Sequence, residues 1–157
     1  MQNTTLCYIE KDGAYLMLHR TKKEHDINKD KWIGIGGHCE ENESPEDCIL
    51  REAKEETGLT LTEFRYAGII TFVTDDGEGE YMHLFHATSF TGTLAACNEG
   101  DLQWVPVSNI MSLPHWQGDE IFLSLMQRRA PFFSLKLVYE HGKLRQAVLN
   151  ARELPLT

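Results

Sequence analysis

Long apolar runs and paired cysteines are both missing from this sequence. No stretch approaches the roughly 20 apolar residues that a membrane-spanning helix needs, and residues 1–13 lack the basic region and apolar run of a signal peptide. The four cysteines show no C-x-x-C spacing, so neither a zinc knuckle nor a disulfide framework is indicated. We therefore expect a cytoplasmic protein with free thiols and without a membrane partner.

Positive charge is also scarce, since 15 Lys and Arg residues face 24 Asp and Glu residues, a formal net charge of −9. This composition disfavours polymeric nucleic acid as a partner, because such binding depends on many Lys and Arg contacts to phosphates. A small phosphorylated ligand remains compatible with it if metal ions supply positive charge. The length suits one hydrophobic core, and no linker or repeat divides the chain, so a single domain over residues 1–157 is expected.

The apolar patterns predict a mixed α+β chain with two main helices. Ser44, Pro45 and Gly58 place an N-cap, a first-position proline and a glycine stop around a helix at 45–57. Apolar spacing predicts a second helix at 120–129, and residues 21–31 are expected to form a surface loop. Strands are predicted at these ranges, the first four as two hairpins: 6–10, 15–20, 65–74, 81–90, 103–107, 133–139 and 145–149.

Three carboxylates are predicted to share one face of the first helix. At about 100° per residue, Glu55 lies about 60° to one side of Glu52 and Glu56 about 40° to the other, so the three should converge. Like charges at these spacings repel each other, and a hard divalent cation such as Mg²⁺ would offset the repulsion. Taken alone, the triplet is also compatible with a solvated acidic face.

The surroundings of the triplet follow a fixed pattern. The pattern is G-x5-E-x7-R-E-U-x-E-E-x-G-U, where U is apolar, and it is satisfied by Gly37, Glu43, Arg51, Glu52, Ala53, Glu55, Glu56, Gly58 and Leu59. The segment GGHCEENESPEDCILREAKEETGL therefore resembles the box of the Nudix family, because so many matches at fixed spacing seldom coincide by chance. The resemblance implies an α/β/α sandwich with a mixed β-sheet between helices.

The resemblance also implies roles for the box residues in catalysis. Glu52, Glu55 and Glu56 would coordinate Mg²⁺, or Mn²⁺ as a substitute, together with the carbonyl of Gly36. Glu52 is the preferred general base. Glu99 is the alternative base and a further metal ligand, because it lies in NEGDLQWV, which resembles the metal-contacting loop of MutT-type members.

Glu43 and Arg51 lie on either side of the start of this helix. An ion pair between them would lock the preceding loop against the helix and orient Glu52. Two histidines offer a competing metal site, but His83 and His86 are three apart in a predicted strand and should point to opposite faces. A zinc site is therefore not expected there.

Outside the box, the chain resembles the MutT-type oxidised purine nucleoside triphosphate diphosphatases over nearly its whole length, through KWIGIGGH, ITF, NEGDLQWV, PHWQGDEIF and PFFSLKLVY. The resemblance implies that Trp116 stacks on the base and that Asp119 bonds its edge. Ile33 and Phe72 would press on the same ligand, and Lys23 would meet the terminal phosphates. The alternative is that Trp116 merely covers the core and Asp119 caps the last helix.

Two residues depart from the vertebrate members, namely Ile33 in place of an asparagine and Gly118 in place of an acid. The resemblance implies a Mg²⁺-dependent enzyme that cuts a nucleoside triphosphate into monophosphate and pyrophosphate, with oxidised purines such as 8-oxo-dGTP leading. Alternatives are ADP-ribose, a dinucleoside polyphosphate or another nucleoside triphosphate as the substrate, or a regulatory nucleotide-binding module without turnover. The three intact glutamates argue against such a module, and a monomer or weak homodimer is expected.

Overall fold

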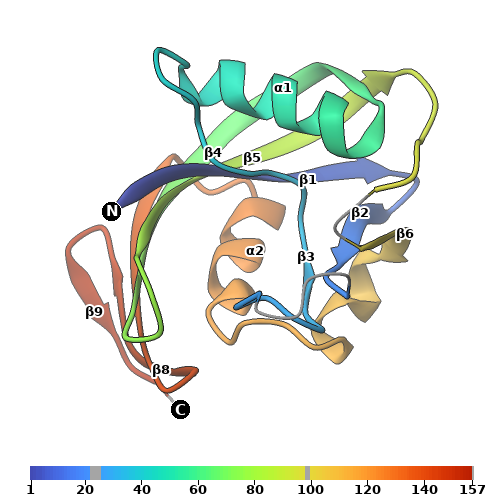
Figure 1. Ribbon diagram of the computed structural model, residues 1–157. Helices are drawn as coiled ribbons and strands as arrows, with labels where there is room; N and C mark the ends of the chain where they lie inside the picture. The colour runs from blue at the N-terminus through green and yellow to red at the C-terminus, as the bar shows by residue number, and fades with distance from the viewer. Residues whose placement is uncertain (22–25, 98–99, 157) are drawn as a thin grey trace.

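The computed structural model describes residues 1–21, 26–97 and 100–156. It shows a mixed β-sheet between two helices (Figure 1). The strands are β1 (Gln2–Lys11), β2 (Ala14–His19), β3 (Trp32–Ile33), β4 (Thr60–Thr74), β5 (Glu80–Thr91), β6 (Asp101–Pro106), β7 (Phe133–Glu140), β8 (Lys143–Leu149) and β9 (Arg152–Leu154). The helices are α1 (Pro45–Thr57) and α2 (Asp119–Gln127), with a short 3-10 segment, η1 (Val107–Ser112). Because α1 and α2 cover opposite faces of the sheet, the predicted α/β/α sandwich is confirmed.

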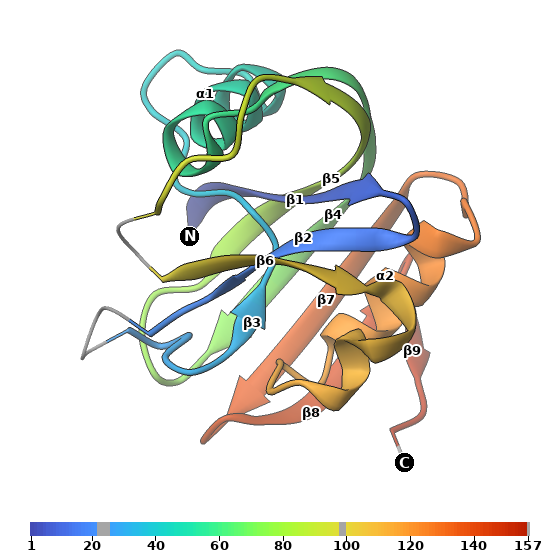
Figure 2. The ribbon, with the colours of Figure 1, turned by 90° about the vertical axis from the view of Figure 1, so that its right-hand side faces the viewer.

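The strand order is β3-β2-β1-β5-β4-β7-β8-β9, with β6 paired to β2. Strands β1 and β5 run parallel, as do β4 and β7, whereas the other pairs are antiparallel. Figure 2 shows β2, β3 and β6 together on one side of the molecule. Both predicted hairpins, β1 with β2 and β4 with β5, are confirmed. Strands β1, β4 and β5 are longer than their predicted ranges, whereas β2 has the predicted length and begins one residue earlier.

Strands β1 and β2 separate soon after their turn, and this separation positions the site. Their paired residues are Glu10 with Tyr15 and Lys11 with Ala14. Farther along β1, residues 35–38 take the place of β2, through bridges from Ile35 to Cys7 and from His38 to Thr4. The segment that leads into α1 is therefore built into the sheet rather than left as a free loop.

Helix α1 has the predicted bounds because its end signals are all local. The Ser44 hydroxyl accepts a hydrogen bond from the Asp47 amide at 3.0 Å, and the Asp47 carboxylate accepts one from the Ser44 amide at 3.0 Å. Gly58 ends the helix in the left-handed conformation, with φ of 81°. Helix α2 instead ends two residues before its predicted limit. Neither helix is both long and apolar enough to cross a membrane, judged on the residues that the structure describes.

The hydrophobic core forms one layer on each face of the sheet. Ile49 and Ala53 of α1 pack on one face, whereas Phe122 of α2 packs on the other. His83 contacts Tyr66 on the α1 side, and His86 contacts Tyr15 on the α2 side. The prediction that these two histidines face opposite ways is therefore confirmed.

Candidate active site

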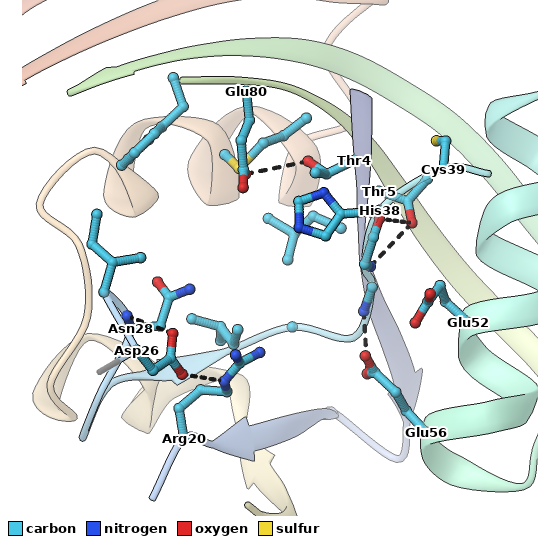
Figure 3. A pocket seen from close by; sticks show the side chains of 18 of the residues that line it. Thr4, Thr5, Arg20, Asp26, Asn28, His38, Cys39, Glu52, Glu56 and Glu80 are labelled. Atoms are coloured by element: carbon cyan, nitrogen blue, oxygen red, sulfur yellow. Dashed lines mark hydrogen bonds and ion pairs between the residues drawn. The ribbon is translucent and has the colours of Figure 1, made fainter. Parts of the chain in front are cut away.

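A cleft of about 600 Å³ lies beside the gap between β1 and β2. It brings together both ends of the site expected from the sequence: Ile33, Gly36, Arg51, Glu52, Glu55, Glu56, Phe72, Trp116 and Asp119. Figure 3 shows its opening, with Glu52 and Glu56 beside α1 and Asp26 and Asn28 on the opposite side. The remaining predictions for Lys23 and Glu99 fall outside the described residues.

The three carboxylates of α1 share one wall of this cleft but face different partners. Glu52 and Glu55 each accept a hydrogen bond from Nη1 of Arg51, at 2.8 and 3.1 Å. Glu56 is buried and accepts a hydrogen bond from the Gly36 amide at 3.3 Å. Among the described residues, no three His, Cys, Asp or Glu side chains are grouped closely enough to hold a metal ion. The expected convergence on one point is therefore wrong for this arrangement, because Arg51 draws two of the carboxylates toward itself.

Arg51 connects α1 to the preceding loop, as the sequence predicted. Its Nε and Nη2 atoms donate to the two oxygens of Glu43, at 2.7 and 2.9 Å, which is a bidentate pair. Nη2 also donates to the His38 carbonyl at 3.0 Å. The hydrogen bonds from Arg51 lower the pKa of Glu43 to about 2, so this pair is charged throughout the neutral range. This bidentate pair with Glu43, called the Arg51 fork below, fixes Nη1 of Arg51 beside Glu52.

The backbone before α1 supplies space and a further oxygen. A Cβ on Gly37 would lie 2.6 Å from the carboxyl group of Glu52, so the missing side chain leaves room for that carboxylate. Gly36 lines the cleft, and no described residue donates a hydrogen bond to its carbonyl. Carboxylate and carbonyl oxygens are the ligands that hard divalent cations prefer. The chemistry of these residues therefore fits Mg²⁺ or Mn²⁺.

Trp116 forms an apolar platform at the other end of the cleft, and its side chain is also buried in the hydrophobic core, as the alternative for this residue expected. Its ring meets the rings of Phe72 and Tyr139 edge to face, with centroids 5.2 and 4.9 Å away. Its Nε1 donates to Asn28 at 2.6 Å, and the ammonium of Lys31 lies 4.4 Å from the ring centre. Sequence reasoning missed Asn28 and Lys31, because they belong to the unpatterned loop before the box.

Asp119 is a buried carboxyl group beside this platform. It is the first residue of α2 and accepts a hydrogen bond from the Trp116 amide at 3.3 Å. The alternative reading of Asp119 as a helix cap is wrong, because the N-cap is Gly118 and no side chain caps the helix. Burial raises the pKa of Asp119 to about 7. The carboxyl group therefore loses its proton near neutral pH and changes from a hydrogen-bond donor to an acceptor.

Gly118 explains why this chain has no second acid before Asp119. A Cβ there would lie 2.5 Å from a methyl group of Leu137 and 2.7 Å from the hydroxyl of Tyr139. That hydroxyl instead accepts a hydrogen bond from the Gly118 amide at 2.7 Å. The space that a second acid would need is therefore filled by β7.

Four polar side chains of the cleft were also missed, namely Glu80, Thr4, Arg20 and Asp26. Glu80 is half-buried at the start of β5 and accepts a hydrogen bond from the Thr4 hydroxyl at 3.3 Å. Burial raises its pKa. The period-two alternation of Glu80, Met82 and Leu84 could have placed Glu80 on the cleft side, but only once the face of β5 was known. Arg20 and Asp26 form an ion pair of 2.6 Å on the side of the opening opposite Glu52 and Glu56 (Figure 3).

The chain was compared with known proteins. A model of the NUDIX domain matches residues 2–126. An oxidized purine nucleoside triphosphate hydrolase from Danio rerio is 31% identical over 130 residues, which cover 82% of this chain and 81% of the relative. A CTP pyrophosphohydrolase from Escherichia coli (strain K12) is 28% identical over 125 residues, or 77% and 90% of the two chains. The crystal structure of a MutT protein from Bacillus halodurans superposes with a TM-score of 0.82 at 22% identity, covering 96% and 98%.

Proposed function

The chain belongs to the Nudix family of hydrolases, and we propose that it converts a nucleoside triphosphate to the monophosphate and pyrophosphate with Mg²⁺. One observation carries this proposal. The carboxylates of α1 and the Trp116 platform line a single cleft, so one nucleotide can contact both ends. We also propose that residues 1–157 act as one domain, because all strands of the described chain belong to one sheet.

The phosphate end of the nucleotide would meet the acidic wall. Glu52, Glu55, Glu56 and the Gly36 carbonyl would hold the metal ions. When bound, such ions polarise phosphate oxygens and make water a stronger nucleophile at neutral pH. Glu52 would accept the proton of the attacking water, because the Arg51 fork holds its carboxylate inside the cleft. Glu99 as the alternative base and Lys23 as a phosphate contact stay predictions.

The base would lie against Trp116, with Ile33 and Phe72 as apolar contacts and Asp119 at its edge. Oxidised purines such as 8-oxo-dGTP are the leading substrates, which gives the enzyme a role in cleaning the nucleotide pool. The name of the Danio rerio relative supports this class. The Escherichia coli relative supports a second candidate, CTP. A cytoplasmic location and a monomeric or weakly dimeric state stay predictions.

A substrate panel tests this function. Purified protein with Mg²⁺ is supplied with 8-oxo-dGTP, dGTP, CTP, ADP-ribose and a dinucleoside polyphosphate, and the products are identified by chromatography. We expect monophosphate and pyrophosphate from a triphosphate, with the highest kcat/KM for 8-oxo-dGTP. Near-equal values for 8-oxo-dGTP and dGTP would remove the selectivity for oxidised purines. Absence of turnover throughout the panel would favour a nucleotide-binding module.

The change Glu55→Gln tests the acidic wall. This side chain is largely exposed, and its loss of charge relieves repulsion on α1, so the melting temperature should stay within a few degrees of the parent. We expect kcat to fall by about 100-fold or more, because a metal ligand is lost. Glu46→Gln is the matched control, since Glu46 is exposed on the same helix away from the cleft. An unchanged kcat in Glu55→Gln would remove Glu55 from the metal site.

A further inference from the structure

The strand register gives the lateral order of residues across the cleft floor. The segment that carries Gly36 borders β1 at Thr4, and β1 borders β5. On β5, Glu80 is paired with Phe72 of β4, whose ring touches Trp116. Neighbouring strands are about 4.8 Å apart, so Thr4 and Glu80 lie between the acidic wall of α1 and the Trp116 platform. Figure 3 shows Glu80 beside Thr4 at the opening, apart from Glu52 and Glu56 near α1.

Glu80 has hydrogen-bonding capacity that the described part of the chain leaves unused. Its Oε2 accepts the 3.3 Å bond from Thr4, and no donor in residues 1–21, 26–97 or 100–156 reaches Oε1. Asp26, on the other side of the opening, is by contrast held by Arg20 at 2.6 Å. A half-buried carboxylate with a free oxygen is costly unless a ligand supplies a donor. Glu80 therefore points to a ligand with a hydrogen-bond donor in the middle of the cleft.

The part of a nucleotide that would lie beside Glu80, between the acidic wall and the Trp116 platform, is the sugar. A phosphate would be repelled by the carboxylate, and the base belongs beyond Phe72, against Trp116. Between them the nucleotide presents hydroxyl groups, which donate to ionised carboxylates, as the acidic residue of dinucleotide-binding folds does with ribose. On the basis of the function proposed above, we propose that Glu80, steadied by Thr4, forms a sugar subsite and accepts a hydrogen bond from a hydroxyl of the nucleotide.

The sugar subsite is tested by removing the hydroxyls one at a time. The value of kcat/KM is measured with Mg²⁺ for GTP, 2′-dGTP and 2′,3′-ddGTP, and for the matching cytidine series. Loss of the hydroxyl bound by Glu80 should lower kcat/KM about tenfold or more, the size expected for a hydrogen bond to a charged group. We call this fall in kcat/KM on removal of one hydroxyl the hydroxyl step. In Glu80→Leu the hydroxyl step should shrink to about twofold or less. The nucleotide pair at which the parent shows the step identifies the hydroxyl that Glu80 binds.

Glu78→Leu is the matched control, because Glu78 lies at the rim of the cleft and its carboxylate pairs with the N-terminal ammonium. It should keep the hydroxyl step of the parent. Glu80→Gln keeps the shape of the side chain and should reduce the step severalfold, which provides the comparison if the leucine variant does not fold. The subsite is overturned if the parent is indifferent to both hydroxyls, or if both Glu80 variants keep the full step.

The sugar subsite and the proposed function fail in different ways. Turnover of the triphosphates without any effect of Glu80 leaves the hydrolase intact and removes the subsite. If the parent releases no pyrophosphate from any nucleotide, the hydrolase proposal fails. The same series of GTP, 2′-dGTP and 2′,3′-ddGTP is then compared by calorimetric binding. A hydroxyl step in affinity that disappears in Glu80→Leu supports the subsite, and its absence overturns it.

Discussion

Two neighbouring glycines in the segment before α1 have different physical reasons to lack a side chain. A Cβ on Gly36 would lie 1.8 Å from the carbonyl oxygen of Thr5, which is backbone and cannot move aside. A Cβ on Gly37 would instead meet the carboxyl end of Glu52, which is a flexible side chain. Gly36 thus permits the segment to join β1, whereas Gly37 permits Glu52 to occupy the cleft.

This difference predicts different outcomes for the two alanine variants. Gly37→Ala should fold with a melting temperature near that of the parent and lose about tenfold or more in kcat, because Glu52 is displaced. Gly36→Ala should be strongly destabilised, because backbone must shift. Thermal unfolding and Mg²⁺-dependent pyrophosphate release check both variants. A fully active Gly37→Ala protein would show that the position of Glu52 is not needed for catalysis.

Helix α1 carries most of what could be predicted from the sequence. Its cap, its glycine stop and its acidic face are set by residues within one or two turns of each other, so a local pattern is sufficient. The fork between Glu43 and Arg51 spans eight residues and was also predicted. The orientation of Glu52 and Glu55 toward Arg51 was not, because helical angles place side chains on a face and do not decide between partners on it.

The middle of the site depends on pairings between distant parts of the chain. Glu80 enters the cleft because β5 lies parallel to β1, an arrangement that no local pattern encodes. The insertion of residues 35–38 beside β1 is equally non-local. Strand β9 and η1 were missed because they are short and weakly patterned. Sequence therefore predicted the two ends of the cleft, through the box and the family resemblance, and not its floor.

At the scale of the element, α1 and its loop should work as a unit through Arg51. A lysine keeps the charge but cannot donate at once to both oxygens of Glu43, the His38 carbonyl and Glu52. Arg51→Lys should therefore lower kcat about 10- to 100-fold and raise the Mg²⁺ concentration needed for half-maximal activity. Arg145→Lys, at an exposed position on β8, is the control. A Mg²⁺ dependence equal to that of the parent would show that Arg51 does not organise the acidic wall.

At the scale of the whole molecule, acidic groups are concentrated where an anionic ligand is expected. The net charge is −9, and Glu52, Glu55, Glu56, Glu80 and Asp119 all line the one cleft. A nucleoside triphosphate adds further negative charge to this region. Binding therefore requires cations at the acidic wall and a neutral or hydrogen-bonded state of the carboxyl groups elsewhere. For Asp119, burial already favours the neutral state.

The neutral state of Asp119 should be measurable in the stability of the whole protein. Its pKa is about 7 in the folded protein against an ordinary value of 3.8. Between these two pH values the folded protein keeps a proton that the unfolded chain has lost, so raising the pH disfavours folding. This carboxyl group should lower the free energy of unfolding by up to about 1.4 kcal/mol per pH unit within that window, and by no further amount above pH 7.

Asp119→Asn removes this titration and keeps an oxygen that can accept the bond from the Trp116 amide. The variant should therefore gain stability relative to the parent as the pH rises from about 4 to 7, with a constant difference above that. His83 and His86, whose burial lowers their pKa, destabilise the protein as the pH falls below their ordinary value, but they are common to both proteins and cancel in the difference. Urea unfolding at pH 5, 6, 7 and 8 measures this difference in the free energy of unfolding between variant and parent. Parallel curves for parent and variant would mean that Asp119 is ionised in the folded protein throughout this range, and that its carboxyl group cannot serve as a hydrogen-bond donor to the base.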